Sequence, residues 1–196
     1  MTPFDERTAL VVVDVQNDFA DPAGSLAVAG GPEVVARVNE AIAAASDAGA
    51  LVVATQDWHP EVTPHFEKDG GLWPVHCVAG TWGAQLHPEL RIGMDAVRVR
   101  KGTAGEDGYS AFTVRDPVSG VETATELEAA LRERGIERVV TCGLATDYCV
   151  RATALDAARL GFDVSLLTGA IAAVNLRPED GHRALADMAE AGVTLA

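Results

Sequence analysis

The sequence lacks features that define several protein classes. Only three of its 196 residues are cysteine (Cys77, Cys142 and Cys149), and this odd, sparse set makes no disulfide framework. Such cysteine usage fits a reducing compartment better than an oxidising one. No Cys-x-x-Cys pair is present, which argues against a thiol-redox role of that type.

Long apolar runs and basic residues are also scarce. No run approaches the roughly 20 apolar residues that span a bilayer. The N-terminal MTPFDERT has neither a basic start nor an apolar signal core, so we expect a cytoplasmic protein. The chain has 15 lysines and arginines against 29 acidic residues, a formal net charge of −14. This balance argues against nucleic acid or an anionic membrane as the main partner.

What is present favours an α/β protein of one domain. No repeat, low-complexity tract or linker divides the chain, and its length suits a single domain over 1–196 with a sizeable core. Val-rich apolar runs recur without polar alternation, which is typical of strands buried on both faces of a parallel sheet. The predicted strands cover 9–15, 50–55, 96–99, 138–142, 164–168 and, weakly, 192–195.

Segments with helical periodicity lie between several of these runs. One begins at Pro32 and stops at Gly49, and another begins with a capping box of Thr123 and Glu126 and stops before Gly135. Two more cover 149–160 and 178–191. The alternation predicts a three-layer α/β/α sandwich with a mainly parallel sheet, whose strand order stays open.

The stretch from about 57 to 91 fits neither pattern. A long irregular connection inside a compact domain is usually functional or disordered. This one holds four of the five histidines and all three tryptophans, a composition wrong for disorder. We therefore expect an ordered active-site excursion.

Reactive residues follow the predicted strands at the ends where ligands bind in open α/β sheets. Asp14 ends the first strand, Asp57 and His59 the second and Lys101 the third, while Cys149 follows the fourth and opens a helix. An acid, an amine, a thiol and metal-type ligands therefore converge on one edge of the sheet.

Cys149 has two interpretations. A lone cysteine is commonly a small buried hydrophobe. At a helix N-terminus, however, the free N–H groups and the helix dipole favour the thiolate, and a Lys101 ammonium would act in the same direction. The same N–H groups could hold an oxyanion. We interpret Cys149 as a nucleophile, Cys142 as a core residue, and leave Cys77 open.

Asp14 and Lys101 also have ordinary alternatives, as a strand-end polar residue and a surface lysine. Beside a thiol, the carboxylate could take the thiol proton and later deliver it to a leaving amine. The lysine could hold both negative charges in place. The three residues together make a coherent set of base, electrostatic support and nucleophile.

A metal site is a further prediction. Asp-x-His at a strand end places both side chains on the same side, and two later histidines could return from the loop. Such a set suits zinc, iron or manganese, although a lone loop histidine is more often solvated and the spacing matches no common metal signature. The candidate ligands are Asp57, His59, His65 and His76.

Five blocks of the sequence resemble the signature blocks of nicotinamidases/pyrazinamidases, in the isochorismatase-like cysteine hydrolase superfamily. The blocks are DVQNDF at 14–19, QDWHP at 56–60, WPVHCVAGT at 73–81, RKG at 100–102 and ATDYCV at 145–150. They occur in family order and the resemblance covers the chain from Thr8 to about Leu195. Tyr148 departs from members with histidine there, and we expect it not to touch the chemistry. The end at Ala196 is abrupt, so we expect that a short C-terminal tail is missing.

The resemblance implies hydrolysis of nicotinamide, and of pyrazinamide, through a cysteine thioester in support of NAD salvage. It implies a triad of Asp14, Lys101 and Cys149 and one divalent metal ion, zinc, iron or manganese, that orients the pyridine ring. The implied ligands are the four metal candidates above. A homo-oligomer is common for such folds.

The resemblance also implies the substrate pocket. Phe19 and Trp73 match aromatic walls around the ring, and Tyr109 matches a pocket tyrosine. The Leu144–Ala145 peptide bond resembles one that is cis in the family, where the N–H groups of Ala145 and Cys149 form the oxyanion hole.

Two alternatives stay open at this point. One is a related cysteine hydrolase that acts on another amide or a ureido substrate, although members with no pyridine to hold generally lack the metal set. The other is a non-catalytic protein with a structural metal, although structural zinc sites are usually closed and cysteine-rich.

Overall fold

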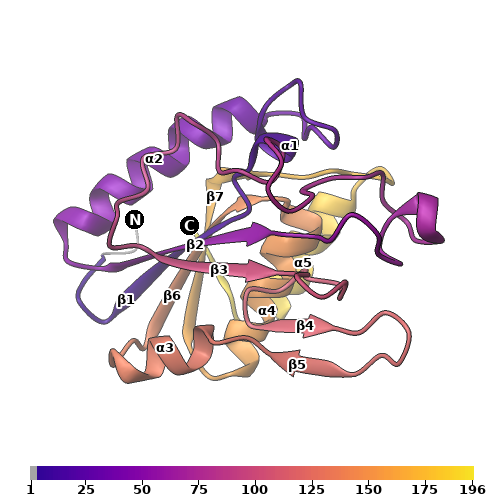
Figure 1. The fold of residues 1–196 in the computed structure, drawn as a ribbon. Coiled ribbons are helices and arrows are strands. Elements are labelled where there is room, and N and C mark those ends of the chain that lie inside the picture. The colour runs from indigo at the N-terminus through magenta and orange to yellow at the C-terminus, as the bar shows by residue number, and fades with distance from the viewer. Residues whose placement is uncertain (1–3) are drawn as a thin grey trace.

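The computed structural model describes residues 4–196, so the first three residues of the N-terminal segment interpreted above lie outside it. Six parallel strands form one sheet in the order β3-β2-β1-β6-β7-β8 (Figure 1). The strands are β1 (Thr8–Val13), β2 (Leu51–Asp57), β3 (Val97–Lys101), β6 (Arg138–Leu144), β7 (Asp163–Ala172) and β8 (Thr194–Leu195). The predicted parallel α/β fold is confirmed, and each predicted strand overlaps one of these six.

Helices cover both faces of the sheet (Figure 1). They are α1 (Asn17–Ala20), α2 (Gly31–Asp47), α3 (Leu127–Glu133), α4 (Arg151–Arg159) and α5 (Asp180–Glu190), with short 3-10 and π turns η1 (Glu67–Asp69) and η2 (Thr146–Val150). Within residues 4–196, no helix is long and apolar enough to cross a membrane.

Strand β1 shows why both faces are apolar. Its residues Ala9, Val11 and Val13 belong to the core shared with α3, α4 and α5, whereas Leu10 and Val12 belong to the core shared with α2. Alternate side chains of a strand point to opposite faces, so a strand covered on both sides has to be apolar at every position. This is the physical origin of the unbroken Val-rich run.

Two of the expected helix starts are wrong. Thr123 is not a capping residue, because it lies in β5 (Glu122–Ala124), which pairs with β4 (Thr113–Arg115) in a small antiparallel hairpin. The helix α3 begins later, where the Thr125 hydroxyl accepts a hydrogen bond from the Leu127 N–H at 3.2 Å. Likewise Cys149 does not open α4 but lies in the preceding π turn η2.

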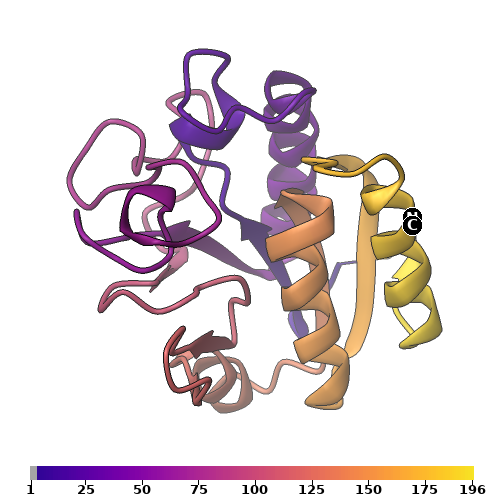
Figure 2. The same ribbon diagram turned by 90° about the vertical axis from the view of Figure 1, so that its right-hand side faces the viewer.

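The connection from β2 to β3 is irregular, with η1 as its one helical turn. It is nevertheless packed: Phe66, His59 and Cys77 are fully buried in it. The part that includes η1 lies beyond the arrowheads of β2 and β3 in Figure 1, and the rest runs back past α2 to the start of β3. Figure 2 looks onto the arrowhead end of the sheet. The first part of the segment predicted as an active-site excursion therefore lies at the carboxyl edge of the sheet.

Candidate active site

Asp14 is held by the neighbouring strand. It follows β1 directly with φ 47°, and it is fully buried. The Thr55 hydroxyl in β2 accepts from the Asp14 N–H at 3.1 Å and donates to Asp14 Oδ1 at 2.6 Å. Burial raises the pKa of Asp14 to about 6, against the opposing effect of the Lys101 ammonium. Asp14 can therefore exchange a proton near neutral pH.

Lys101 ends β3 and is buried, not exposed as an ordinary surface lysine would be. Its Nζ donates to Asp14 Oδ2 at 2.7 Å and to Asp57 Oδ1, and lies 3.7 Å from Cys149 Sγ. Burial alone would lower the pKa of Lys101, but the two carboxylates outweigh it and hold the pKa well above its usual value. The ammonium therefore stays charged and links the other three groups.

Cys149 differs from the sequence expectation of a resting thiolate. Burial raises the pKa of its thiol well above the usual value, and Asp14 and Asp57 add to the rise against the effect of Lys101. The ammonium that was expected to favour the thiolate is itself neutralised by the two carboxylates. The thiol therefore keeps its proton at rest, and a role as nucleophile requires a base to remove it.

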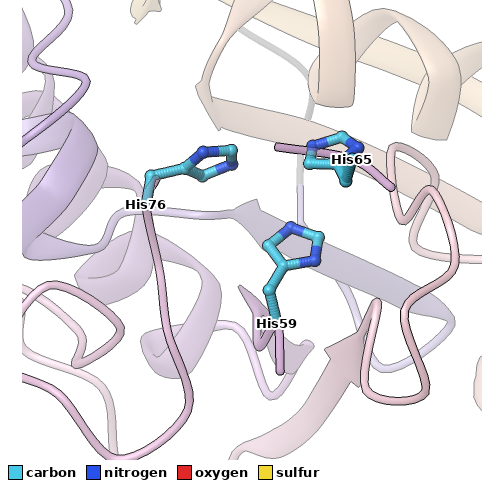
Figure 3. Close-up of side chains that lie close together, drawn as sticks. All are labelled: His59, His65 and His76. Atoms are coloured by element: carbon cyan, nitrogen blue, oxygen red, sulfur yellow. The ribbon is translucent and has the colours of Figure 1, made fainter. Parts of the chain in front are cut away.

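Three imidazoles from the excursion meet beside this trio. Each of His59, His65 and His76 offers a ring nitrogen that lies within 4.8 Å of the others, and Figure 3 shows the rings turned toward one space. Asp57 Oδ2 lies 3.7 Å from His59 Nε2 and 3.9 Å from His76 Nε2. We call these four residues the histidine–aspartate cluster.

The donor set of this cluster fits a metal ion. Both ring nitrogens of His59 are buried and have no hydrogen-bond partner in the described part of the chain. Buried polar atoms of this kind are rare without a ligand or ordered water. Burial lowers the pKa of His76 to about 4, so its ring is neutral at pH 7, as a metal ligand has to be. Three imidazoles and one carboxylate suit zinc, iron or manganese.

Second contacts leave specific ring atoms free in two of the histidines. His76 Nδ1 donates to the Pro74 carbonyl at 2.8 Å, and His65 Nδ1 bonds Asp107 Oδ1 at 2.8 Å. In each of these two rings, Nε2 is therefore the nitrogen that can bind a metal ion. Asp57 belongs to both groups, since its Oδ1 accepts from Lys101 and its Oδ2 faces the imidazoles. Burial by itself would raise the pKa of Asp57, but the Lys101 ammonium outweighs it and holds this pKa below its usual range.

A small pocket of about 30 Å³ is lined by Cys149 of the trio and by Asp57, His65 and His76 of the cluster. In its wall, the Trp73 Nε1–H donates to the Tyr109 hydroxyl at 2.9 Å, and burial raises the pKa of Tyr109 to about 12. The lining residues are Phe19, Leu26, Asp57, His65, Trp73, His76, Tyr109, Ala145, Tyr148, Cys149 and Val174.

The pocket contains all three predicted substrate-binding residues and three that sequence reasoning did not select. Tyr148 lies edge-on to Trp73 with ring centroids 4.7 Å apart, so it forms part of the wall beside the thiol. Leu26 and Val174 come from loops with no polar motif, and no signal in the sequence distinguishes them. The Leu144–Ala145 peptide bond is cis, as the resemblance implied, and Ala145 lies in the pocket wall with Cys149.

Supporting residues of the site come mainly from the block after β1. The Gln16 side chain accepts from the Asp57 N–H and donates to the Asp57 carbonyl, both at 2.8 Å. The buried Asp18 carboxylate accepts from the Cys77 N–H at 2.7 Å and from the Ser25 N–H at 3.0 Å. Cys77 has φ 46° and follows His76 directly, so Asp18 holds the backbone beside a cluster residue.

The remaining cysteines and histidines lie outside the site. Cys77 and Cys142 are buried and free, and Cys142 packs in the core as expected. His182 is exposed and faces Glu179, while His87 lies 3.9 Å from Asp21. Neither histidine joins the cluster described above.

Comparison with known proteins relates the chain as a whole to known enzymes. The family profile for the isochorismatase domain matches residues 8–196. The nicotinamidase of Escherichia coli (strain K12) is 38% identical over 203 residues, covering 95% of this chain and 93% of that protein. The nicotinamidase/pyrazinamidase of Mycobacterium tuberculosis is 40% identical over 190 residues, covering 95% and 97%.

Solved structures agree with this grouping. The pyrazinamidase of Pyrococcus horikoshii in complex with zinc is 43% identical, with a TM-score of 0.86 over 97% of this chain and 98% of that one. PnC1 from L. infantum in complex with nicotinate is 38% identical, with a TM-score of 0.88 over 100% and 95%. These likenesses extend over the whole fold.

Proposed function

The chain belongs to the isochorismatase family, and we propose that within it this protein is a nicotinamidase that hydrolyses nicotinamide to nicotinate and ammonia. It is an amidohydrolase, and pyrazinamide is a second expected substrate. The observation that carries the proposal is the buried trio of Asp14, Lys101 and Cys149, whose Cys149 lines a small pocket walled by aromatic rings. In a cell this activity would return nicotinamide to NAD salvage.

The first half-reaction replaces the amide with a thioester. Asp14 takes the proton of the Cys149 thiol, and Sγ bonds to the carboxamide carbon. The carbonyl oxygen becomes an oxyanion, and we propose that the N–H groups of Ala145 and Cys149 hold it. Asp14 then gives its proton to the departing nitrogen, the C–N bond breaks, and ammonia leaves.

The second half-reaction consumes one water molecule. Asp14 again acts as base, the hydroxide adds to the thioester carbon, and the C–S bond breaks. The thiolate takes back the proton from Asp14, and the product acid leaves and loses its proton to solvent as nicotinate. Lys101 stays charged throughout and stabilises whichever of Asp14 and Cys149 is negative.

We propose the histidine–aspartate cluster as the site of one divalent metal ion. The unpartnered ring of His59 and the four convergent donors support this assignment, and the relative from Pyrococcus horikoshii was solved with zinc. When bound, such an ion supplies a coordination position for the pyridine nitrogen of the substrate. Zinc, iron and manganese all suit the donors.

The walls of the pocket would orient the ring and keep water away. Phe19 and Trp73 offer the apolar faces on which an aromatic ring packs, and Tyr109 keeps the Trp73 indole in place. Fixing the ring fixes the distance from its carboxamide carbon to Sγ, which converts binding energy into orientation.

The sparse cysteines support a cytoplasmic location in a reducing compartment. The net charge of −14 supports a small-molecule substrate rather than nucleic acid or an anionic membrane. We also propose that residues 1–196 act as one domain and that the protein can form a homo-oligomer.

Ammonia release from nicotinamide by purified, zinc-loaded protein tests the activity. We expect release by the wild type and none above background from Cys149→Ala. A folded, metal-loaded wild type that releases no ammonia from nicotinamide, but releases it from a ureido or other amide compound, would instead show the related hydrolase considered above.

A further inference from the structure

A carboxylate outside the proposed catalytic groups contacts the histidine–aspartate cluster. Asp107 belongs to the segment between β3 and Tyr109, and its Oδ1 lies 2.8 Å from His65 Nδ1. The two side chains are 18% and 4% exposed, so water competes little for this bond. A carboxylate only accepts hydrogen bonds, so His65 Nδ1 carries the proton and donates it. In a neutral ring, this leaves Nε2 with a free lone pair.

The position of Asp107 does not depend on this hydrogen bond. Its backbone N–H and carbonyl pair with Arg115 at 2.8 and 2.9 Å in an antiparallel bridge. The Thr63 hydroxyl donates to the Gly105 carbonyl at 3.1 Å and accepts from the His65 N–H at 3.2 Å. The segment is therefore fastened to the loop that carries His65 at a second point, and it presents the carboxylate to the ring from a fixed backbone.

The next residue contacts the catalytic trio. The Gly108 carbonyl accepts a hydrogen bond from Lys101 Nζ. A Cβ at Gly108 would lie 2.8 Å from the Gly102 backbone nitrogen and 3.0 Å from Lys101 Cβ, so only glycine allows this approach. Two consecutive residues thus reach one imidazole of the cluster and the catalytic ammonium.

We propose that Asp107 is a positioning residue of the metal centre: its carboxylate holds His65 in the tautomer and orientation that present Nε2 as a ligand. The inference rests on the proposed metal site. Carboxylates that accept from ligand histidines fix the tautomer and make the ring a better ligand, and their loss typically costs about 10–100-fold in metal affinity. The neighbouring Glu106 is a matched control, because its carboxylate accepts from the Ala104 N–H instead.

The test is the dissociation constant of Zn²⁺, measured on purified apoprotein by competition with a chelator. We expect Asp107→Ala to raise it about 10–100-fold, Glu106→Ala to leave it within about twofold, and Asp107→Glu to recover part of the loss. Because Asp107 acts through His65, Asp107→Ala should change nothing further in a His65→Ala background. Unchanged zinc affinity in Asp107→Ala, or an equal loss in both backgrounds, would overturn the proposal.

The tautomer of His65 gives a readout that does not require metal or turnover. Long-range ¹H–¹⁵N spectra of the apoprotein should show His65 protonated at Nδ1 in the wild type and in Glu106→Ala, and a shift toward Nε2 protonation in Asp107→Ala. An Nε2-protonated wild type would contradict the inference. A wild type that binds no zinc would remove the metal site itself, whereas a zinc-binding wild type with an indifferent Asp107 would remove only this inference.

Discussion

The proposed catalytic trio and the histidine–aspartate cluster lie beside one pocket but are held in different ways. Asp14 and Lys101 end parallel strands and Cys149 follows a third, so the register of the sheet brings them together. The three imidazoles come from an irregular connection, which is held by isolated backbone bridges, such as His59 with Val78, and by single side-chain hydrogen bonds instead of a continuous ladder. Chemistry therefore depends on the sheet, and metal binding on loop contacts that single substitutions can remove.

Asp57 joins the two sets, since one carboxylate oxygen meets Lys101 and the other faces His59 and His76. Apart from Asp57, a substitution in the trio should therefore lower mainly turnover, and one that supports the cluster should lower mainly metal affinity. Four predictions test this separation, beginning with the largest expected effect.

Cys149→Ala should reduce kcat by about 10⁴-fold or more, because the nucleophile of the thioester route is lost. Cys149 is not one of the four proposed ligands, and its Sγ lies 3.7 Å from Lys101 Nζ, so zinc affinity should stay within about twofold of the wild type. Steady-state ammonia release and chelator competition on the same preparation check both halves. Substantial activity in this variant would contradict the nucleophilic scheme.

Lys101→Met should abolish most activity and also lower the free energy of unfolding by about 3–5 kcal/mol, since it leaves Asp14 and Asp57 buried without their shared cation. Denaturant unfolding of apoprotein measures the loss. As a control, Lys68→Met removes a lysine that is exposed beside Asp69 and should change stability by less than about 1 kcal/mol. Equal effects of the two variants would mean that the buried pairings contribute nothing.

The dependence of kcat/KM on pH is a second way to distinguish the trio from the cluster. Asp14 has to be ionised to take the thiol proton, and burial raises its pKa to about 6. A base with a raised pKa loses its competent form as the pH falls, so kcat/KM should drop about tenfold per unit below this value. Zinc content is measured at each pH. If activity falls only at pH values where zinc is also lost, the fall reflects loss of metal from the cluster and not protonation of Asp14.

Asp18→Asn should have the smallest effect and act on the cluster. The amide keeps one acceptor, but its NH₂ group faces the Cys77 or Ser25 N–H, so the backbone beside His76 loses one hold. We expect zinc affinity to fall about 3–10-fold, less than for direct support of a ligand, while kcat at saturating zinc stays near the wild-type value. A large fall in kcat with unchanged zinc affinity would show that Asp18 supports the catalytic trio instead.

Much of this protein follows from its sequence alone. A strand covered on both faces must be apolar throughout, so the Val-rich runs predicted the parallel sheet, and the direction of the strands predicted that Asp14, Asp57 and Lys101 share one edge. The family resemblance identified the four cluster residues and the pocket aromatics, because it depends only on residue types and their order in the sequence. Local sequence pattern does not determine, however, which strands pair or which polar side chains become buried.

Tertiary structure decided the rest. Thr123 has the sequence of a helix cap, but pairing with Val114 across the β4–β5 hairpin places it in a strand. Full burial and two carboxylates keep Cys149 protonated, although its place before a helix favours the thiolate. The contact of Asp107 with His65 spans 42 positions in the chain. Burial, net local charge and contacts between distant segments exist only once the chain has folded, and they set how these residues can act.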